Sequence, residues 1–430
     1  MSDTPNIGFV RHEPIPPSPP PVQQAGVVKW VRENLFSNWV NSILTILSIY
    51  FVVKIILAST PWMWNGVWTT SSLRECREVL QGTSGACWSV LAERWNQMLF
   101  GFQYPVEAYW RPTLAFVLLL VCIAPVLFQK LPRKMLIFSA IYPFLAFWLI
   151  WGGTLLTPVI VGLSLIAGYM AFVKTERLIG FATGLLSGVV AVALVLYLGS
   201  FVTAALSGFI ALELVASRDM GGFMLNLILG TVCVSLSIPL GIVLALGRQS
   251  NMPIIKGICV VFIEFIRGVP LITLLFVANV VLSYFFPPGT NLDLILRVII
   301  MITLFSAAYI AEVIRGGLAA LPRGQYEAAD SLGLDYPQAM RLIILPQALK
   351  ISIPGIVNVA VGLFKDTTLV SVISMFDLVG MIRGPISSST AWTGIYWELY
   401  LFAILLFFVV CYGISQYSQW LERQLRTDHH

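Results

Sequence analysis

The chain has 430 residues, of which 58% are hydrophobic and only 11% are charged. Soluble proteins carry roughly 25% charged residues, so the charges here are too few to cover a globular surface in water. The composition therefore excludes a soluble protein and predicts an all-α integral membrane protein, a polytopic helical bundle. The modest net charge of +5 gives no indication of nucleic-acid binding.

Common nucleotide-binding and metal-binding motifs are missing from the sequence. No Gly-Lys pair occurs, and a Walker A phosphate loop requires one before Ser or Thr. The three histidines, His12, His429 and His430, lie near the two ends of the sequence. We therefore expect no catalytic residue, no metal ion and no cofactor bound by this chain.

Residues 1–38 contain the proline-rich stretch PIPPSPPP at 14–21, which has no apolar periodicity. This stretch predicts a disordered tail. The first apolar run, 39–58, is too long for a secretory signal and has no small-residue cleavage site, so we expect it to stay as a membrane anchor.

Ten apolar runs are long enough to cross a membrane as helices. They span 39–58, 112–129, 135–151, 154–173, 178–200, 221–246, 256–286, 295–314, 351–373 and 396–417. The uncharged stretch 135–173 is too long for one helix and contains Gly152 and Gly153, so we expect a hairpin of two helices there. We divide the chain into an N-terminal membrane region (39–214), a second membrane region (215–417) and a short tail (418–430).

The distribution of Lys and Arg predicts the orientation. With the N-terminus in the cytoplasm, most basic residues fall in cytoplasmic segments, and basic residues resist translocation; both termini are therefore predicted to be cytoplasmic. Residues 59–111 then form a long outer, periplasmic loop that contains Cys76 and Cys87. Outside the cytoplasm these thiols can form a disulfide, and two unpaired thiols are the alternative.

The apolar runs of the N-terminal membrane region are almost purely apolar, whereas several charged residues lie in or beside the runs of the second membrane region. An ionisable group at membrane depth is costly unless it is paired or faces water, so we expect the functional core here. Glu264 and Arg267 are three residues apart and predict a local ion pair on a helix. Gly268 and Pro270 follow directly and predict a kink in this long run.

The polar sequence KDTT at 365–368 interrupts an apolar run. We interpret Lys365, Asp366 and Thr367, together with Arg267 and Glu264, as candidates for lining a substrate path. A purely structural ion pair is the alternative.

The segment 315–350 is predicted to form two short helices with a glycine turn between them. Pro322 suits a first helical turn, and Gly333 suits a left-handed stop. Asp335 predicts the start of the second helix, which we expect to end at Pro346. Small residues at 328, 329 and 331 would let another protein approach the first helix closely.

Several residues of this segment match a family pattern. The spacing of Glu327-Ala328-Ala329, Gly333, Ile343 and Leu345-Pro346 resembles the EAA loop of permease subunits in bacterial ABC importers. FIRGVPL at 265–271, PQALK at 346–350 and LFKDTTL at 363–369 resemble the polar amino acid branch of that family. The long N-terminal half is similar in layout to general L-amino acid transport system permeases. We call residues 315–350 the EAA segment.

The resemblance implies a fold and a mechanism. The last five spans would form a type I ABC-importer permease core in the bacterial inner membrane. A periplasmic binding protein would deliver an L-amino acid to a heterodimer of this chain and a second permease. Two copies of a separate ABC ATPase, holding ATP and Mg, would grip the EAA segment. The residues that would take this coupling role are Glu327, Ala328, Ala329, Gly333, Ile343, Leu345 and Pro346.

Other classes of function compete with this interpretation. An ion-gradient-driven secondary carrier would also have intramembrane charges and kinked helices, but usually has two similar halves, which this chain lacks. A lipid-modifying membrane enzyme would need several convergent catalytic groups, and few candidates exist. A passive scaffold subunit, with the substrate held by its partner, is the third alternative.

Overall fold

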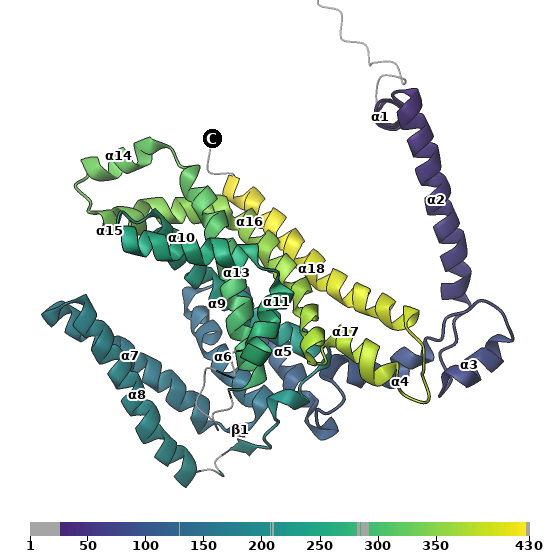
Figure 1. The fold of residues 1–430 in the computed structure, drawn as a ribbon, viewed down its shortest axis with the longest axis horizontal. Coiled ribbons are helices and arrows are strands. Elements are labelled where there is room, and N and C mark those ends of the chain that lie inside the picture. The colour runs from purple at the N-terminus through teal and green to yellow at the C-terminus, as the bar shows by residue number, and fades with distance from the viewer. Residues whose placement is uncertain are drawn as a thin grey trace, which may run out of the picture. The chain divides into compact units, whose positions relative to one another are not determined.

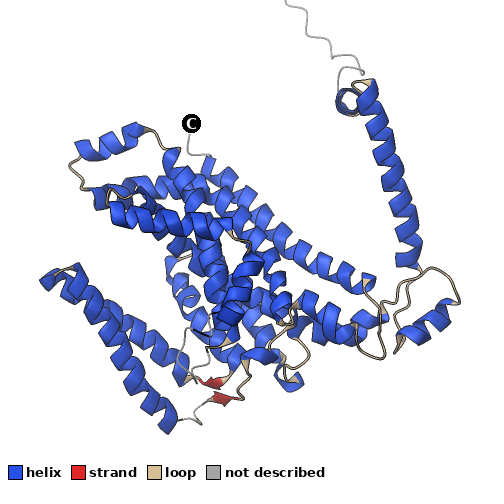
Figure 2. Ribbon diagram, in the orientation of Figure 1, coloured by secondary structure: helices blue, strands red, loops and turns tan. Residues whose placement is uncertain are grey.

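The computed structural model describes residues 26–128, 130–206, 208, 210–281, 284 and 292–426. Nearly all regular structure within these ranges is helical, as Figure 2 shows. Nine described helices are long and apolar enough to cross a membrane, and a bent helix pair brings the number to ten. The predicted all-α bundle of about ten spans is confirmed.

The chain forms two compact units, which are described separately. The first consists of the described parts of Met1–Val67 and Arg77–Cys87, and the second of Trp68–Cys76 and Trp88–His430. In the first unit, α1 (Gly26–Asn34) is an amphipathic helix with an i,i+4 pair between Lys29 and Glu33. The predicted disordered tail is therefore wrong for 26–34. Its proline-rich part lies outside the described residues.

The first membrane helix, α2 (Trp39–Trp64), begins at the residue predicted for the first span. The Asn38 side chain caps it by accepting a hydrogen bond from the Asn41 N–H. The helix continues six residues beyond the predicted end. The predicted outer loop 59–111 also contains regular structure, namely α3 (Leu73–Leu80), α4 (Ser89–Phe100) and a 3₁₀ turn (Val106–Ala108).

Four long helices complete the N-terminal half. They are α5 (Trp110–Leu127), α6 (Leu136–Trp151), α7 (Leu156–Ile179) and α8 (Phe181–Ala205). The turn between α6 and α7 lies at the predicted glycines: Gly152 and Gly153 both have positive φ, at 78° and 81°. A two-residue strand, β1 (Gly153–Thr154), pairs there with β2 (Ala211–Leu212).

The second membrane region is built on three helices, α9 (Gly222–Gln249), α13 (Leu294–Ala319) and α16 (Leu345–Asp366) (Figure 1). Gly241 of α9 abuts Ile310 of α13, and Gly317 of α13 abuts Ala348 of α16. These close approaches leave no room for a Cβ atom, so glycine permits the packing. A 28-residue helix such as α9 is about 42 Å long, so the two ends of this bundle are well separated.

The run predicted as one kinked span is two helices, α10 (Pro253–Gly268) and α11 (Leu271–Phe276), followed by a π-helical turn (Val277–Val281). Their axes differ by 103°. Val269 is extended, as expected before a proline, and Pro270 cannot donate to a continuing helix. The predicted end of this span, 286, lies outside the described residues.

The last two described helices are α17 (Leu378–Met381) and α18 (Trp397–Arg426). A π-helical turn (Ile382–Ile386) follows α17. We refer to the end of the bundle that carries residues 312–350 as the EAA end, and to the end that carries α17 as the α17 end. Residues 418–426 of the predicted tail continue α18, and the rest of that tail lies outside the described residues.

Candidate functional site

The EAA segment folds as two short helices around a glycine turn. α14 (Arg323–Ser331) begins after the extended Pro322, and Gly333 has φ of 70°. The Leu334 N–H donates to the Ala329 carbonyl at 3.2 Å, which is the 6→1 bond of a Schellman stop. α15 (Tyr336–Ala339) then begins at Asp335, whose carboxylate accepts from the Gln338 N–H at 2.9 Å.

The predicted helix end at Pro346 is wrong. A π-helical turn (Met340–Ile344) connects α15 to α16, and Pro346 lies in the first turn of α16. Proline has no N–H and would leave one carbonyl of a regular helix unpaired. The wider π turn just before it accommodates that loss, so the chain continues as helix.

The three EAA residues differ in exposure. Glu327 and Ala328 are exposed, whereas Ala329 is only 1% exposed and faces its own chain. The expectation that Ala329 belongs to an open docking surface is therefore wrong. The exposed surface of the turn combines Ala328 and Ser331 with two large apolar side chains, Leu332 and Tyr336.

The EAA segment is anchored to the membrane helices by an apolar cluster. Its buried members come from α9, α10 and α13 as well as from the segment itself: Ala245, Ile263, Ile310, Ala311, Ile314, Leu318, Leu321, Met340, Ile344 and Ala348. Ile343 and Leu345 of the family pattern pack against this cluster. The Gln347 amide donates to Gln325 at 2.9 Å and ties α16 to α14.

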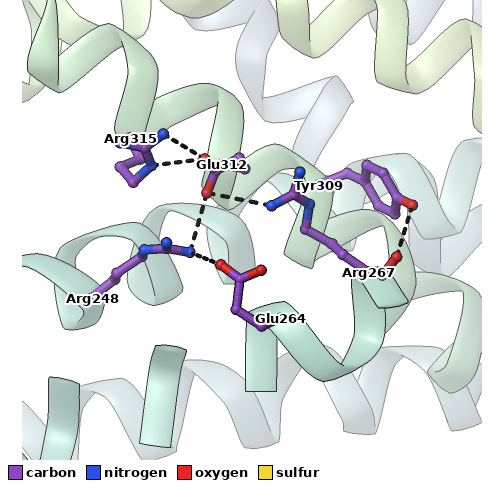
Figure 3. A network of polar contacts seen from close by, with 6 residues as sticks. All are labelled: Arg248, Glu264, Arg267, Tyr309, Glu312 and Arg315. Atoms are coloured by element: carbon purple, nitrogen blue, oxygen red, sulfur yellow. Dashed lines mark hydrogen bonds and ion pairs between the residues drawn. The ribbon is translucent and has the colours of Figure 1, made fainter. Parts of the chain in front are cut away.

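A network of five charged side chains lies at the same end of the bundle, and Glu312 is at its centre (Figure 3). The Glu312 carboxylate accepts from Arg315 at 2.8 Å and from Arg248 at 3.2 Å, and lies 3.7 Å from Arg267. Arg248 also donates to Glu264 at 2.9 Å. The network joins the end of α9 to α10 and α13.

The predicted ion pair between Glu264 and Arg267 is wrong. Glu264 pairs with Arg248 and Arg267 pairs with Glu312, so both partners come from other helices. The i,i+3 rule considers one helix alone, whereas Arg248 reaches across from α9. Arg267 also lies over the Tyr309 ring at 5.5 Å, and the Tyr309 hydroxyl donates to the Arg267 carbonyl at 3.5 Å near the end of α10.

The candidate path residues at the end of α16 lie in different environments. Lys365 is exposed, Asp366 is partly exposed and Thr367 is completely buried. The Thr367 hydroxyl donates to the Phe364 carbonyl at 2.7 Å and accepts from Asn226 at 2.9 Å. The Thr367 hydroxyl is therefore occupied by internal contacts. The assignment to a substrate path stays a prediction for Lys365 and Asp366, and likewise for Glu264 and Arg267 of the charged network.

Sequence reasoning missed the partners of Thr367. The Asn226 amide also donates to Asp377 at 3.2 Å and accepts from the Leu378 N–H. Asp377 is completely buried and caps α17 by accepting from the Gly380 N–H at 2.9 Å. An aspartate directly before a short apolar stretch, as in Asp377-Leu378, is only a weak indication of a helix cap, and the single asparagine in α9 gave no indication of its partners.

Two cysteines differ from the rest. Cys76 and Cys87 are each disulfide-bonded, whereas Cys122, Cys233, Cys259 and Cys411 are free thiols. Among the described residues, no group of three or more His, Cys, Asp or Glu could hold a metal ion.

Residues 237–427 match the family model described as binding-protein-dependent transport system inner membrane component. The glutamate/glutamine/aspartate/asparagine transport system permease protein BztC of Rhodobacter capsulatus is 52% identical over the full length of both chains. The inner membrane amino-acid ABC transporter permease protein YhdY of Escherichia coli is 38% identical over 96% of each. The probable glutamine ABC transporter permease protein GlnP of Bacillus subtilis is 32% identical over 47% of this chain and 90% of its own.

A crystal structure of an amino acid ABC transporter with histidines matches 47% of this chain with 32% identity and a TM-score of 0.43. Similarity to BztC and YhdY extends over the N-terminal half as well as the region that the family model matches. The chain therefore belongs to the family of ABC importer permeases, the inner membrane subunits of binding-protein-dependent transport systems, which are not themselves enzymes.

Proposed function

We propose that this permease translocates L-amino acids across the bacterial inner membrane as one subunit of a permease heterodimer. A periplasmic binding protein delivers the substrate, and two copies of an ABC ATPase hold ATP and Mg. The names of the relatives BztC and YhdY support amino acids as the substrate class. No cofactor is required in this chain under this division of labour.

The geometry of the EAA segment carries the coupling part of the proposal. Its helix–glycine–helix turn presents Ala328, Leu332 and Tyr336 on the surface, while Ile344 and Met340 are buried in the cluster shared with α9, α10 and α13. A partner that moves this turn must therefore move the end of the bundle with it. We assign Glu327, Ala328 and Gly333 to the ATPase contact, and Ala329, Ile343, Leu345 and Pro346 to its support.

The proposed orientation places both termini and the EAA end in the cytoplasm and the α17 end in the periplasm. The distribution of Lys and Arg supports it. Cysteine labelling with a membrane-impermeant reagent tests it: a cysteine at exposed Ser331 should react only in inverted vesicles, and one at exposed Ser388 only in right-side-out vesicles.

Reconstitution tests the function. The complex with the partner permease, ATPase and binding protein should accumulate amino acids only when ATP is supplied. Uptake without the ATPase would instead favour the secondary carrier. Within this complex, Asp366→Ala should weaken uptake if Asp366 accepts the substrate ammonium group, and should leave it unchanged if the partner permease holds the substrate.

We further propose broad selectivity. Lys365 and Asp366 could hold the α-carboxylate and α-ammonium groups that all amino acids share, and readout of a side chain would need further polar anchors. Competition uptake assays test this, and recognition of a single amino acid would contradict it.

A further inference from the structure

The helix α4 belongs to the N-terminal half but packs against the second membrane region. It contacts α9, α17 and α18 at the α17 end, and Figure 1 shows it beside α17 and α18. The Trp95 ring lies 5.3 Å from Phe402 of α18, and the Phe102 ring, just after α4, lies 5.6 Å from Phe376. The relative GlnP matches 47% of this chain over 90% of its own length, so about half of this chain has no match in that relative.

The junction between α4 and α9 depends on glycines. The Gly221 N–H donates to the Phe100 carbonyl at 3.3 Å, and a Cβ atom on Gly101 would lie 2.8 Å from the Gly221 backbone. Gly222 has φ of 61° and abuts the Met98 carbonyl. Two backbone segments can approach this closely only where they carry no side chains, so the glycines at the end of α4 and at the start of α9 permit this contact.

The start of α9 is also tied to the segment that leads into α17. The Gly222 N–H donates to the Phe376 carbonyl at 2.8 Å, and Gly222 forms a bridge with Asp377. Asp377 in turn binds Asn226 and caps α17. α4, the start of α9 and residues 375–381 therefore form one hydrogen-bonded unit.

A side-chain contact extends this unit to the irregular loop 387–396. The indole N–H of Trp392, which is completely buried, donates to the Glu93 carboxylate of α4 at 2.8 Å. The Leu73 N–H donates to the Ala391 carbonyl at 2.8 Å. The loop has little regular structure of its own, and Ser388, Thr390 and Thr393 on it are exposed. Trp392, the largest buried side chain of this loop, is therefore oriented by Glu93, which belongs to the N-terminal half of the chain.

We propose that α4 is a brace for the α17 end of the permease, and that Glu93 is a positioning residue that holds loop 387–396 in the shape that the binding protein meets. This inference rests on the proposed function and orientation. A loop that must be ordered on docking costs binding free energy, whereas a loop already held in place does not. Loss of the Glu93–Trp392 bond should therefore weaken docking and leave later steps unchanged.

The experiment titrates liganded binding protein against ATPase activity of the reconstituted full complex. Glu93→Ala should raise the half-saturating concentration about fivefold with an unchanged maximal rate, because it removes the charge-assisted hydrogen bond to Trp392. It also removes an ion pair with the neighbouring Arg94 at 3.2 Å, which is partly exposed and does not touch the loop. Glu93→Gln keeps an acceptor oxygen and should restore the wild-type value. The double variant Glu93→Ala/Trp392→Phe should be no worse than Glu93→Ala alone. Asn96→Ala, an exposed position on the same helix, is the matched control.

Hydrogen–deuterium exchange separates the brace from the proposed function, because it needs no binding protein. Residues 387–396 should exchange faster in Glu93→Ala than in wild type or Asn96→Ala. Unchanged exchange would overturn the brace. Faster exchange with an unchanged half-saturating concentration would overturn the docking role, and a wild-type complex that no binding protein stimulates would contradict the proposed function itself.

Discussion

The carboxylate of Glu312 lies 3.2 Å from the guanidinium of Arg248, so α13 and the end of α9 are joined by a hydrogen-bonded ion pair. The Glu264 carboxylate of α10 accepts a hydrogen bond from the same guanidinium nitrogen at 2.9 Å. These helices also share the apolar cluster that holds the EAA segment. The EAA segment is thus supported by both charge pairs and apolar packing.

Glu312→Gln should lower the thermal midpoint of the purified permease. It removes the carboxylate that three guanidinium groups share, and losing a hydrogen-bonded charge of this kind costs about 1–3 kcal/mol, reduced here because Arg315 and Arg267 are partly exposed. Glu264→Gln is the matched control: it breaks one ion pair at a half-exposed carboxylate and should have a smaller effect. Equal midpoints for the two variants would contradict the central role of Glu312.

Ala328→Glu and Ala329→Glu should fail for different reasons. Ala328 is exposed, so the variant should insert and assemble normally and lose substrate-stimulated ATP hydrolysis. Ala329 is 1% exposed, so its variant must bury or expel a charge and should lower the amount of folded permease. Membrane protein levels and ATPase activity, measured on both variants, separate the two outcomes. Normal levels of Ala329→Glu would contradict the burial.

The stability of the α17 end should depend on pH through Asp377. This residue lies outside the membrane-spanning helices, in the segment that connects the last two of them. Burial raises the pKa of Asp377 to about 6, while hydrogen bonds from Gly380 and Asn226 lower it by less. The unfolded value is about 3.9, so the folded state binds more protons between about pH 4 and pH 6. Stability should fall as pH rises through that window, by on the order of 2 kcal/mol.

Asp377→Asn cannot titrate and still caps a helix, so it should flatten this fall. Thermal midpoints between pH 4.5 and pH 7 measure the difference. A slope identical to that of the wild type would show that another group is responsible.

Apolar run length predicted the spans well because a membrane helix must be long and apolar whatever its neighbours are. The turn at Gly152 and the break at Pro270 were also predictable, since positive φ and a missing N–H are local properties. The stop at Gly333 follows the same logic.

Partners across helices were not predictable in this way. Arg248 lies in neither the Glu264 nor the Glu312 helix, and its reach decides the ion pairing of both. The burial of Ala329 likewise depends on how α14 packs against the π turn 340–344. The sequence around Thr367 showed a polar interruption of an apolar run, but it could not show that the Asn226 amide would donate to the Thr367 hydroxyl.

Cys76 and Cys87 are predicted to form a disulfide with each other on the periplasmic side. Closing a short loop in this way is worth roughly 3 kcal/mol in the chain-entropy model, so reduction should loosen the outer segment without unfolding the spans. Thiol labelling of intact cells with an impermeant reagent, before and after reductant, provides the measurement. Labelling without reductant would argue against the bond, and no labelling under any condition would argue against the topology.

Gly333→Asp should damage coupling more than expression. Gly333 has φ of 70°, where a Cβ atom costs on the order of 1 kcal/mol, and apart from its chain neighbours no residue lies within 4 Å of the place that a Cβ would take. The substitution therefore produces no clash, but it adds a carboxylate to the exposed turn between α14 and α15. Gly333→Asn is the matched control, because asparagine tolerates the same conformation without the charge.

We expect both variants to insert and to assemble with the partner permease, and only Gly333→Asp to abolish substrate-stimulated ATP hydrolysis and uptake. Wild-type uptake by Gly333→Asp would show that the ATPase does not approach this turn, whereas equal losses in both variants would assign the effect to the backbone angle between the two helices.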